Sequence, residues 1–422
     1  MADPPVSFRR RPDLACSPAE LTTRLAHLPG FMFFDSSGYP PHQSEPQISL
    51  LTGAPEQVFE GDISSASDRR PLQSYLENNH QPAPAHLPPG GLFGWIDYHG
   101  RFSFKATFQV AVYHHETKTW WEHGDWLDLA QKEPKKATLP PLHTERWQVS
   151  QSDADFLDAV ARARDYIAAG DIYQVNLSRR FSHPFPATPA DLFPLYQQLR
   201  GQTPAPMSAF LNLGDTTILS SSPETFLRLD QRQLETRPIK GTRPRIPHDP
   251  AADQKMAAEL VSSEKERAEL IMITDLLRND LGQVADFGTV QVPHLLQLEP
   301  LEHVHHLVST VTARLRHKTT HLETLAACLP GGSITGAPKK RACEIIAELE
   351  PAPRGPYTGI AGYLGNNGHS QFNILIRSLY HQKDILAYHV GAGIVADSDP
   401  TAELAETELK AQGIRQALRQ TD

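Results

Sequence analysis

The first part of the chain is built from short apolar runs that are separated by proline and glycine. Proline cannot donate to a strand ladder and glycine permits tight turns, so this pattern indicates short strands joined by turns. Strands joined in this way pair antiparallel, because parallel pairing needs a long crossover connection. Residues 1–150 are therefore predicted to form antiparallel sheet, with strands at Gly30 to Phe34, Gln47 to Leu51, Gly91 to Ile96 and Phe108 to His114.

A proline-containing stretch from Pro134 to Pro141 ends this region, and alternating helices and strands are predicted from there onward. We interpret the stretch as a linker between residues 1–150 and 151–422. A helix is expected to begin near Ser152, because the sequence Ser-Asp-Ala-Asp offers side-chain oxygens to the amide groups of a first turn. A length of 422 residues permits two or three domains but does not require more than one.

The composition argues against several classes of protein. The chain is 39% hydrophobic and 21% charged, as globular proteins are, and its net charge of -9 disfavours a nucleic-acid binder. It contains no run of about 20 apolar residues, so neither a membrane span nor a signal peptide is predicted. Cys16, Cys328 and Cys343 fit no paired or metal-binding spacing, which indicates a reducing compartment, and a cytoplasmic location is expected.

The clearest helix is predicted from Asp249 to Leu281, and two acidic residues lie on its apolar stripe. Steps of three and four residues lead from Glu266 to Glu269 and then to Ile273, so both carboxylates continue the buried face. Burying a carboxylate costs several kcal/mol unless a cation or hydrogen bonds compensate it. The pair is either a ligand for a cation or a helix edge with arginine-paired acids.

A second acidic pair follows near the end of the sequence. A strand is predicted from Ile385 to Val390, then a turn from Gly391 to Asp397, and a helix that begins at Ser398 with an aspartate cap and a proline. Glu403 and Glu406 fall on one face of that helix. A surface ion pair from Glu406 to Lys410 would contribute only about 0.3–0.5 kcal/mol, whereas two such glutamate pairs would suit Mg²⁺.

Lys240 lies between Pro238 and a Gly241-Thr242 turn, with Glu224 not far upstream. A lysine fixed in this way is placed to act as a positioned amine, which is a nucleophile's setting. The alternative is an ordinary solvated lysine on a turn, because proline and glycine mark turns in any protein.

Three other patterns imitate known sites. Gly391 to Ala396 fits the dinucleotide fingerprint, but no acidic residue follows at the required distance. Gly331 to Gly336 resembles a phosphate loop, yet Ala337 stands where lysine is required, so only a general anion-binding turn is predicted. A zinc site at His303, His305 and His306 is rejected, because alternate residues of a strand face opposite sides.

Taken together, the ordered motifs resemble the chorismate-utilising enzymes. The resemblance implies a single α/β domain in which two antiparallel sheets pack face to face with helices outside, so that residue 140 lies within the domain. The motifs are Gly170 to Arg179, Ser222 to Glu224, Pro238 to Thr242, Glu266 to Asp280, His306 to Ser309, Gly332 to Lys339, Arg354 to Tyr357, Ile376 to Ser378 and Gly391 to Glu406.

The same resemblance assigns roles around the substrate chorismate. Glu269 and Glu406 would bind Mg²⁺ directly, and Glu266 and Glu403 directly or through water. Glu224 would be the general acid for the C4 hydroxyl, a role that needs a carboxyl with a raised pKa. The remaining implied residues are His306 beside the departing group, Gly241, Thr242 and Ser333 around the ring, and Tyr357, Arg377 and the backbone of Gly391 and Gly393 at the second carboxylate.

Two positions select a branch of the family by resemblance. Gln174 stands where water-adding members carry lysine, which implies that ammonia is the nucleophile. Lys240 stands where members that form anthranilate carry alanine, which implies amination at C4, with Lys240 attacking C2 covalently. The implied product is 4-amino-4-deoxychorismate, for 4-aminobenzoate and folate biosynthesis. Anthranilate formation, and a non-catalytic member that binds a glutaminase or an aromatic ligand, are the alternatives.

The resemblance also implies partners. Ammonia would come from a separate glutaminase subunit, because neither a glutaminase nor a pyridoxal-phosphate lyase is recognisable in the sequence. The segment from Phe33 to Ser37, with Ser36, resembles an amino-acid pocket of the family. Its acidic residue is displaced to Asp35, so the binding of tryptophan is left open.

Overall fold

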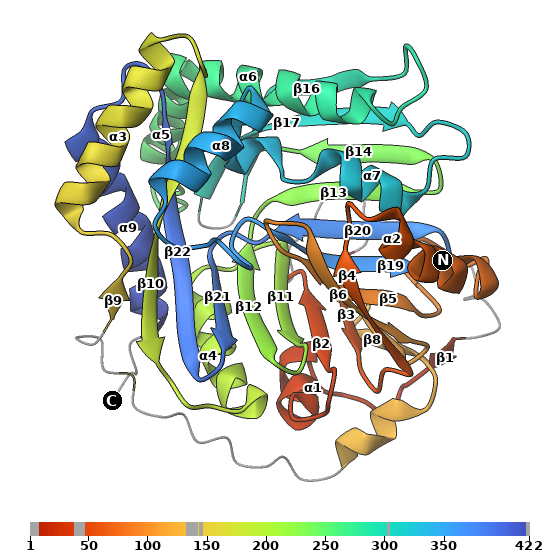
Figure 1. Cartoon of the computed structure of the whole chain (residues 1–422). Coiled ribbons are helices and arrows are strands. Elements are labelled where there is room, and N and C mark those ends of the chain that lie inside the picture. Colours follow the sequence, from red (N-terminus) through yellow and green to blue (C-terminus); the bar gives the residue numbers. More distant parts are fainter. Residues whose placement is uncertain (1–7, 38–46, 132–141, 143–146, 302–303, 419–422) are drawn as a thin grey trace.

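The computed structural model describes residues 8–37, 47–131, 142, 147–301 and 304–418, and its strands form two large antiparallel sheets (Figure 1). In both sheets, strands from residues 1–150 pair directly with strands from residues 151–422, since β2 pairs with β11 and β5 with β19. The first sheet contains, in order of neighbours, β1 (Arg9–Arg10), β8 (Thr119–His123), β7 (Val110–His114), β3 (Ile48–Thr52), β2 (Met32–Asp35), β11 (Met207–Asn212), β12 (Thr216–Ser222), β21 (Ser378–Gln382), β22 (Ile385–Ile394), β10 (Gln174–Pro184) and β18 (Gly336–Ala337), with β9 (Gln148–Val149) beside β10.

The second sheet and the helices complete the layers. Helices α3 and α9 lie at the left of Figure 1, and α6 and α8 at the top. The second sheet contains β15 (Ile239–Pro244), β17 (Val304–Arg314), β14 (Gln233–Arg237), β13 (Thr225–Asp230), β20 (His369–Ile374), β19 (Ile360–Gly365), β5 (Gly91–Ile96), β6 (Arg101–Thr107) and β4 (Gln57–Asp62), with β16 (Gln291–Pro300) beside β17. The helices are α1 (Pro18–Leu25), α2 (Ala66–Asn78), α3 (Asp153–Ala168), α4 (Pro189–Gln202), α5 (Pro250–Ser262), α6 (Glu264–Gly282), α7 (His321–Cys328), α8 (Lys339–Leu349) and α9 (Pro400–Leu418), with short 3-10 helices η1 (Trp126–Gln131) and η3 (Gly332–Ile334).

Apolar side chains from both sheets meet in one buried cluster. Met32 and Leu50 come from the first sheet, and Phe93 and Ala361 from the second, and all of them are at most 2% exposed. Burial of this kind is the main favourable contribution to folding. The predicted fold class, with two face-packed antiparallel sheets and outer helices, is confirmed.

Several predicted elements agree with the structure. Strand β5 has the predicted bounds, β2, β3 and β7 overlap the other predicted strands, and α3 begins after Ser152. Ser152 and Asp155 form a reciprocal capping box, in which each side chain accepts from the other's backbone amide. The predicted linker at 134–141 lies outside the described residues.

The predicted helix from Asp249 to Leu281 is wrong, because the structure has two helices, α5 and α6, that meet at Ser263. This residue has an extended ψ of 109°, and its side chain accepts a hydrogen bond from the Glu266 amide at 3.4 Å. Serine favours such a capping geometry over a helix interior. The break starts a new helix just before the first acidic pair.

The predicted turn from Gly391 to Asp397 is also wrong in its first half. Strand β22 continues to Ile394, because its backbone pairs with β10 as far as Val175. A Cβ atom on Gly391 would lie 2.6 Å from Asn176 Oδ1, so the glycine permits close packing here rather than a turn.

Within the described residues, no helix is both long and apolar enough to cross a bilayer.

Close packing of β19 against its neighbour gives a test of the fold. A Cβ atom on Gly362 would lie 1.9 Å from the carbonyl oxygen of Gln371. We expect Gly362→Ala to destabilise the protein by about 1–3 kcal/mol or more, because the strands must separate. Its thermal midpoint should fall, whereas Gly201→Ala, in open space on α4, should leave it equal or higher. Equal midpoints for the two variants would contradict the β19–β20 packing.

Candidate active site

A cavity of about 670 Å³ lies where the two sheets meet helices α6 and α9. Its wall includes His389 and Gly391 of β22 from the first sheet, and Lys240 of β15 and His306 of β17 from the second. A volume of this size suits a small-molecule ligand. Of the predicted site residues, Glu224, Lys240, Gly241, Thr242, Glu266, Glu269, His306, Ser333, Tyr357, Arg377, Gly391, Gly393 and Glu406 line it, whereas Gln174, Glu403 and Ser36 do not.

Glu224 lies between β12 and β13 and is 5% exposed. Burial raises the pKa of its carboxyl to about 7, although a hydrogen bond with Ser333 and the charges of Lys240 and Arg377 act in the opposite direction. A carboxyl with this pKa holds its proton in a large share of molecules at neutral pH. It can therefore act as a general acid.

Lys240 projects from β15 at a bulge against β17. The register shifts between Lys240 and Thr242, and Gly241 there has a left-handed φ of +75°. The lysine Nζ lies 3.3 Å from Glu269 Oε2, and its side chain is only 18% exposed. A Cβ atom on Gly241 would lie 3.0 Å from Glu266 Oε2, so glycine is required for this strand to approach the acidic helix.

The two predicted glutamate pairs come from different helices. Glu266 and Glu269 lie in the first turns of α6, and Glu403 and Glu406 in the first turns of α9. Burial and the neighbouring Glu269 raise the pKa of Glu266, and burial followed by Glu406 and Glu269 raises the pKa of Glu403. Burial is the largest single effect on Glu406, in the raising direction, but the combined effects of Lys410, Lys265 and Lys240 lower its pKa. A carboxylate of one pair therefore affects the pKa of a carboxylate in the other.

These four glutamates are candidate ligands for a divalent cation. Among the residues that the structure describes, no three His, Cys, Asp or Glu side chains converge as a ready-made metal site. Glu403 is 3% exposed, and although Ser398 donates to its Oε1 at 2.7 Å, its buried Oε2 has no hydrogen-bond partner. Mg²⁺ usually binds one or two protein carboxylates and completes its shell with substrate oxygens and water. The donor set fits Mg²⁺ in that mode.

A second group of cavity residues is suited to an anion. Burial raises the pKa of Tyr357 to about 12, so its hydroxyl keeps its proton and can donate. Burial lowers the pKa of Arg377, whose guanidinium nevertheless stays charged. Next to them, Gly391 and Gly393 expose bare backbone, and a Cβ on Gly391 would lie 2.9 Å from the Tyr357 hydroxyl. Such donors match a carboxylate.

Histidines of β17 divide between two environments, as strand alternation predicts. His306 points toward the cavity, 3.1 Å from Thr242 Oγ1, whereas His305 Nε2 lies 3.0 Å from Asp253 Oδ1. Burial, with a smaller effect of Arg377, lowers the pKa of His306 to about 4, so its ring is neutral at pH 7. His303 lies outside the described residues.

Gln174 lies just behind the cavity wall. It is 2% exposed, its Oε1 has no partner, and its Nε2 would lie 2.6 Å from a Cβ on Gly393. The same Cβ position is 3.7 Å from Lys240 Nζ, so the amide and the amine approach Gly393 together.

Several residues that line the cavity were not predicted from the sequence. His389 stacks on Tyr357 with ring centres 4.8 Å apart, and its Nδ1 is buried without a partner. Strand alternation could have found it, since it lies two residues before Gly391 on one face. Asn176 follows Gln174 in the same way. The basic residues Arg243, Lys265 and Lys410 also line the wall, and no pattern distinguished them from surface charges.

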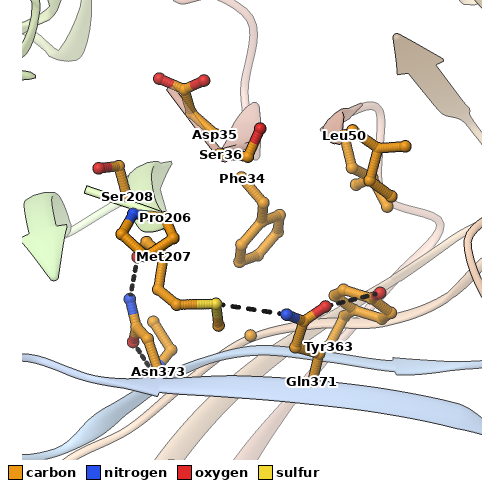
Figure 2. Close-up of a pocket in the computed structure, with 13 residues that line it drawn as sticks. Phe34, Asp35, Ser36, Leu50, Pro206, Met207, Ser208, Tyr363, Gln371 and Asn373 are labelled. Atoms are coloured by element: carbon orange, nitrogen blue, oxygen red, sulfur yellow. Dashed lines mark hydrogen bonds between the residues drawn. The ribbon is translucent and has the colours of Figure 1, made fainter. Parts of the chain in front are cut away.

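Ser36 belongs to a separate pocket of about 50 Å³ (Figure 2). Met207 lies there beside Asn373 and Gln371, and Asn373 donates to the Met207 carbonyl oxygen at 2.8 Å. The Asp35 carboxylate is engaged by Arg200, Tyr196, Ser37 and Ser49. The space is sufficient for a few water molecules.

Sequence similarity links this chain to known proteins. The sequence matches the family described as chorismate binding enzyme over residues 53–416. Anthranilate synthase component 1 of Streptomyces coelicolor is 45% identical over 291 residues, which cover 68% of this chain but only 56% of that protein. Aminodeoxychorismate synthase component 1 of Escherichia coli is 38% identical over 427 aligned residues, covering 91% of this chain and 92% of that protein.

A solved structure extends the likeness to the fold. Anthranilate synthase component I from Streptococcus pneumoniae is 29% identical and superposes with a TM-score of 0.75, covering 88% of this chain and 93% of that chain. Because the family match spans most of the sequence and includes every residue that lines the large cavity, this chain belongs to the chorismate binding enzyme family.

Proposed function

We propose that the protein is an aminodeoxychorismate synthase component I, which replaces the C4 hydroxyl of chorismate by an amino group. The observation that carries the proposal is that one cavity holds both the Lys240 amine and a buried carboxyl, Glu224, whose pKa is raised to about 7. The first is a nucleophile and the second is an acid able to release a hydroxyl as water.

Chorismate has two carboxylates, and the cavity offers a different partner for each. A Mg²⁺ ion at the four glutamates would hold the ring carboxylate and balance its charge. The carboxylate of the enolpyruvyl group would be bound by Arg377, the Tyr357 hydroxyl and the backbone of Gly391 and Gly393. Bound in this way, the ring would lie in the cavity that Lys240 and Glu224 both line.

In the proposed reaction, the uncharged Lys240 amine forms a bond to C2, the two ring double bonds shift toward C4, and the C4 hydroxyl leaves as water with the Glu224 proton. Ammonia then forms a bond to C4, the double bonds shift back, and the C2–nitrogen bond breaks to release Lys240. The Glu224 carboxylate takes the surplus proton of the new ammonium group. The balance is chorismate plus ammonia giving 4-amino-4-deoxychorismate plus water.

Ammonia would be supplied by a separate glutaminase subunit, as the component number in the names of the relatives suggests. Gln174 lies close to Lys240, near Gly393. Its side-chain amide is not a base and cannot activate water, which favours ammonia as the incoming nucleophile.

Anthranilate synthase component I is the second candidate, favoured by the 45% identity to the Streptomyces coelicolor protein. In that reaction ammonia adds at C2 and pyruvate is lost, so no lysine nucleophile is needed. The position of Lys240 in the cavity is what favours the first candidate.

The products decide between the two candidates. Purified protein with chorismate, Mg²⁺ and ammonium should form 4-amino-4-deoxychorismate, detected by mass, and 4-aminobenzoate should appear only after a lyase is added. Abundant fluorescent anthranilate without a lyase would overturn the assignment. An unreacted substrate, with both ammonium and a glutaminase supplied, would favour a non-catalytic protein instead.

Removal of the amine tests the covalent step. Lys240→Ala should lose C4 amination by about 10²-fold or more, because the nucleophile is absent. The control is Lys255→Ala, an exposed lysine of α5 that pairs only loosely with Glu259 at 4.0 Å. In the wild type without ammonia, intact-mass measurement should detect the chorismate adduct on Lys240. Unchanged output from Lys240→Ala would refute the covalent route.

The pKa of Glu224 sets a pH dependence. The acid must carry a proton, so the part of kcat/KM that depends on Glu224 should be lost as pH rises through about 7. Free ammonia must be held constant across the series, since its own protonation varies with pH. Glu224→Gln should lose about 10²–10⁴-fold and its remaining rate should not show this decline. Glu77→Gln, exposed on α2, is the control. A profile that is the same for wild type and Glu224→Gln would exclude this role.

A further inference from the structure

Each glutamate of the two pairs, Glu266 with Glu269 and Glu403 with Glu406, has one basic side chain close to it. Arg243 and Lys410 also donate hydrogen bonds to backbone carbonyl oxygens. Lys240 is the proposed nucleophile, whereas Lys265, within the described residues, has no second role. Its Nζ reaches from α6 to Glu403 Oε1 of α9 at 3.9 Å. The other pairs are Arg243 with Glu266 at 3.9 Å, Lys240 with Glu269 at 3.3 Å and Lys410 with Glu406 at 2.7 Å.

Lys265 affects more than its nearest partner. Its charge opposes the rise in the pKa of Glu266 and of Glu403, and it contributes to lowering the pKa of Glu406. One ammonium group therefore acts on three of the four carboxylates and lies between the two helices. A divalent cation bound by both glutamate pairs would need the same region.

Lys265 interacts only weakly with Glu403. Its contact with Glu403 is longer than a hydrogen bond, and Glu403 Oε2 stays buried without a partner. The lysine side chain is 56% exposed, so it can move into solvent. Lys410 differs, because it also donates to the Gly391 carbonyl oxygen at 2.8 Å and is fixed in place.

We propose that Lys265 is an internal counter-cation of the metal site. Its ammonium reduces the repulsion between the acidic faces of α6 and α9 while no metal is bound, and a divalent cation displaces it. The inference rests on the proposed metal site at these glutamates. Because two positive charges cannot share the region at low cost, Lys265 weakens metal binding relative to what the glutamates alone would give.

The test measures metal binding directly, without substrate. Lys265→Met keeps a long side chain but removes the charge, and it should bind Mn²⁺ roughly fivefold more tightly than the wild type, as expected for an exposed ion pair. Paramagnetic resonance of free Mn²⁺ gives the affinity. The metal-free thermal midpoint should fall, and the rise on adding Mg²⁺ should be larger. Lys265→Gln should behave in the same way, and Lys265→Arg should stay near wild type.

Two further variants separate the possible failures. Lys255→Met removes a charge from the neighbouring helix α5 and should leave the Mn²⁺ affinity unchanged, so an equal tightening there would reduce the effect to net charge and overturn the proposal. Glu403→Gln should weaken Mn²⁺ binding. If it does and Lys265→Met changes nothing, only the counter-cation is wrong. If Glu403→Gln has no effect, the metal site and the counter-cation both fail.

Discussion

The buried ion pair between Arg354 and Glu350 connects the segments that form one wall of the cavity. The guanidinium is 1% exposed, lies 2.7 Å from Glu350 Oε1, and donates to the carbonyl oxygens of Ile334 and Asn176 at 2.9 and 2.7 Å. It therefore joins the end of α8, the turn at Ser333 and strand β10. A guanidinium this deeply buried would leave an uncompensated charge if Glu350 were lost, at a cost of about 3–5 kcal/mol. The position of the Glu224 partner Ser333 depends on it.

The chemistry of the cavity comes from separate elements that this framework brings together. Glu224 follows the last residue of β12 by two positions, Lys240 lies at a bulge of β15, and the carboxylates begin two helices. Each of these positions depends on a local backbone feature that disturbs the neighbouring structure little. The features are a strand end, a left-handed glycine at Gly241 and a serine cap at Ser263. Functional groups on such features can face one cavity while their flanking residues keep regular backbone pairing.

Local patterns predicted the elements better than the site. The apolar run from Gly91 to Ile96 and the cap at Ser152 were sufficient, because neighbours in sequence determine both. The single helix predicted across Ser263 was wrong, because a serine can end one helix and start another without any change in the apolar stripe. The convergence of Glu224 and Lys240 could not be computed from spacing, because it depends on long-range pairing of β15 with β17, and only the family resemblance suggested it.

The last helix that the structure describes, α9, carries Glu403 and Glu406 and packs on β22, α3 and α4. Protein chains leave the ribosome from the N-terminus, so both sheets can be translated before these two carboxylates exist. During synthesis, the glutamates of α6 are therefore present before those of α9, and only nearby basic side chains can offset their charge. The proposed divalent-cation site is thus complete only after both sheets have been translated.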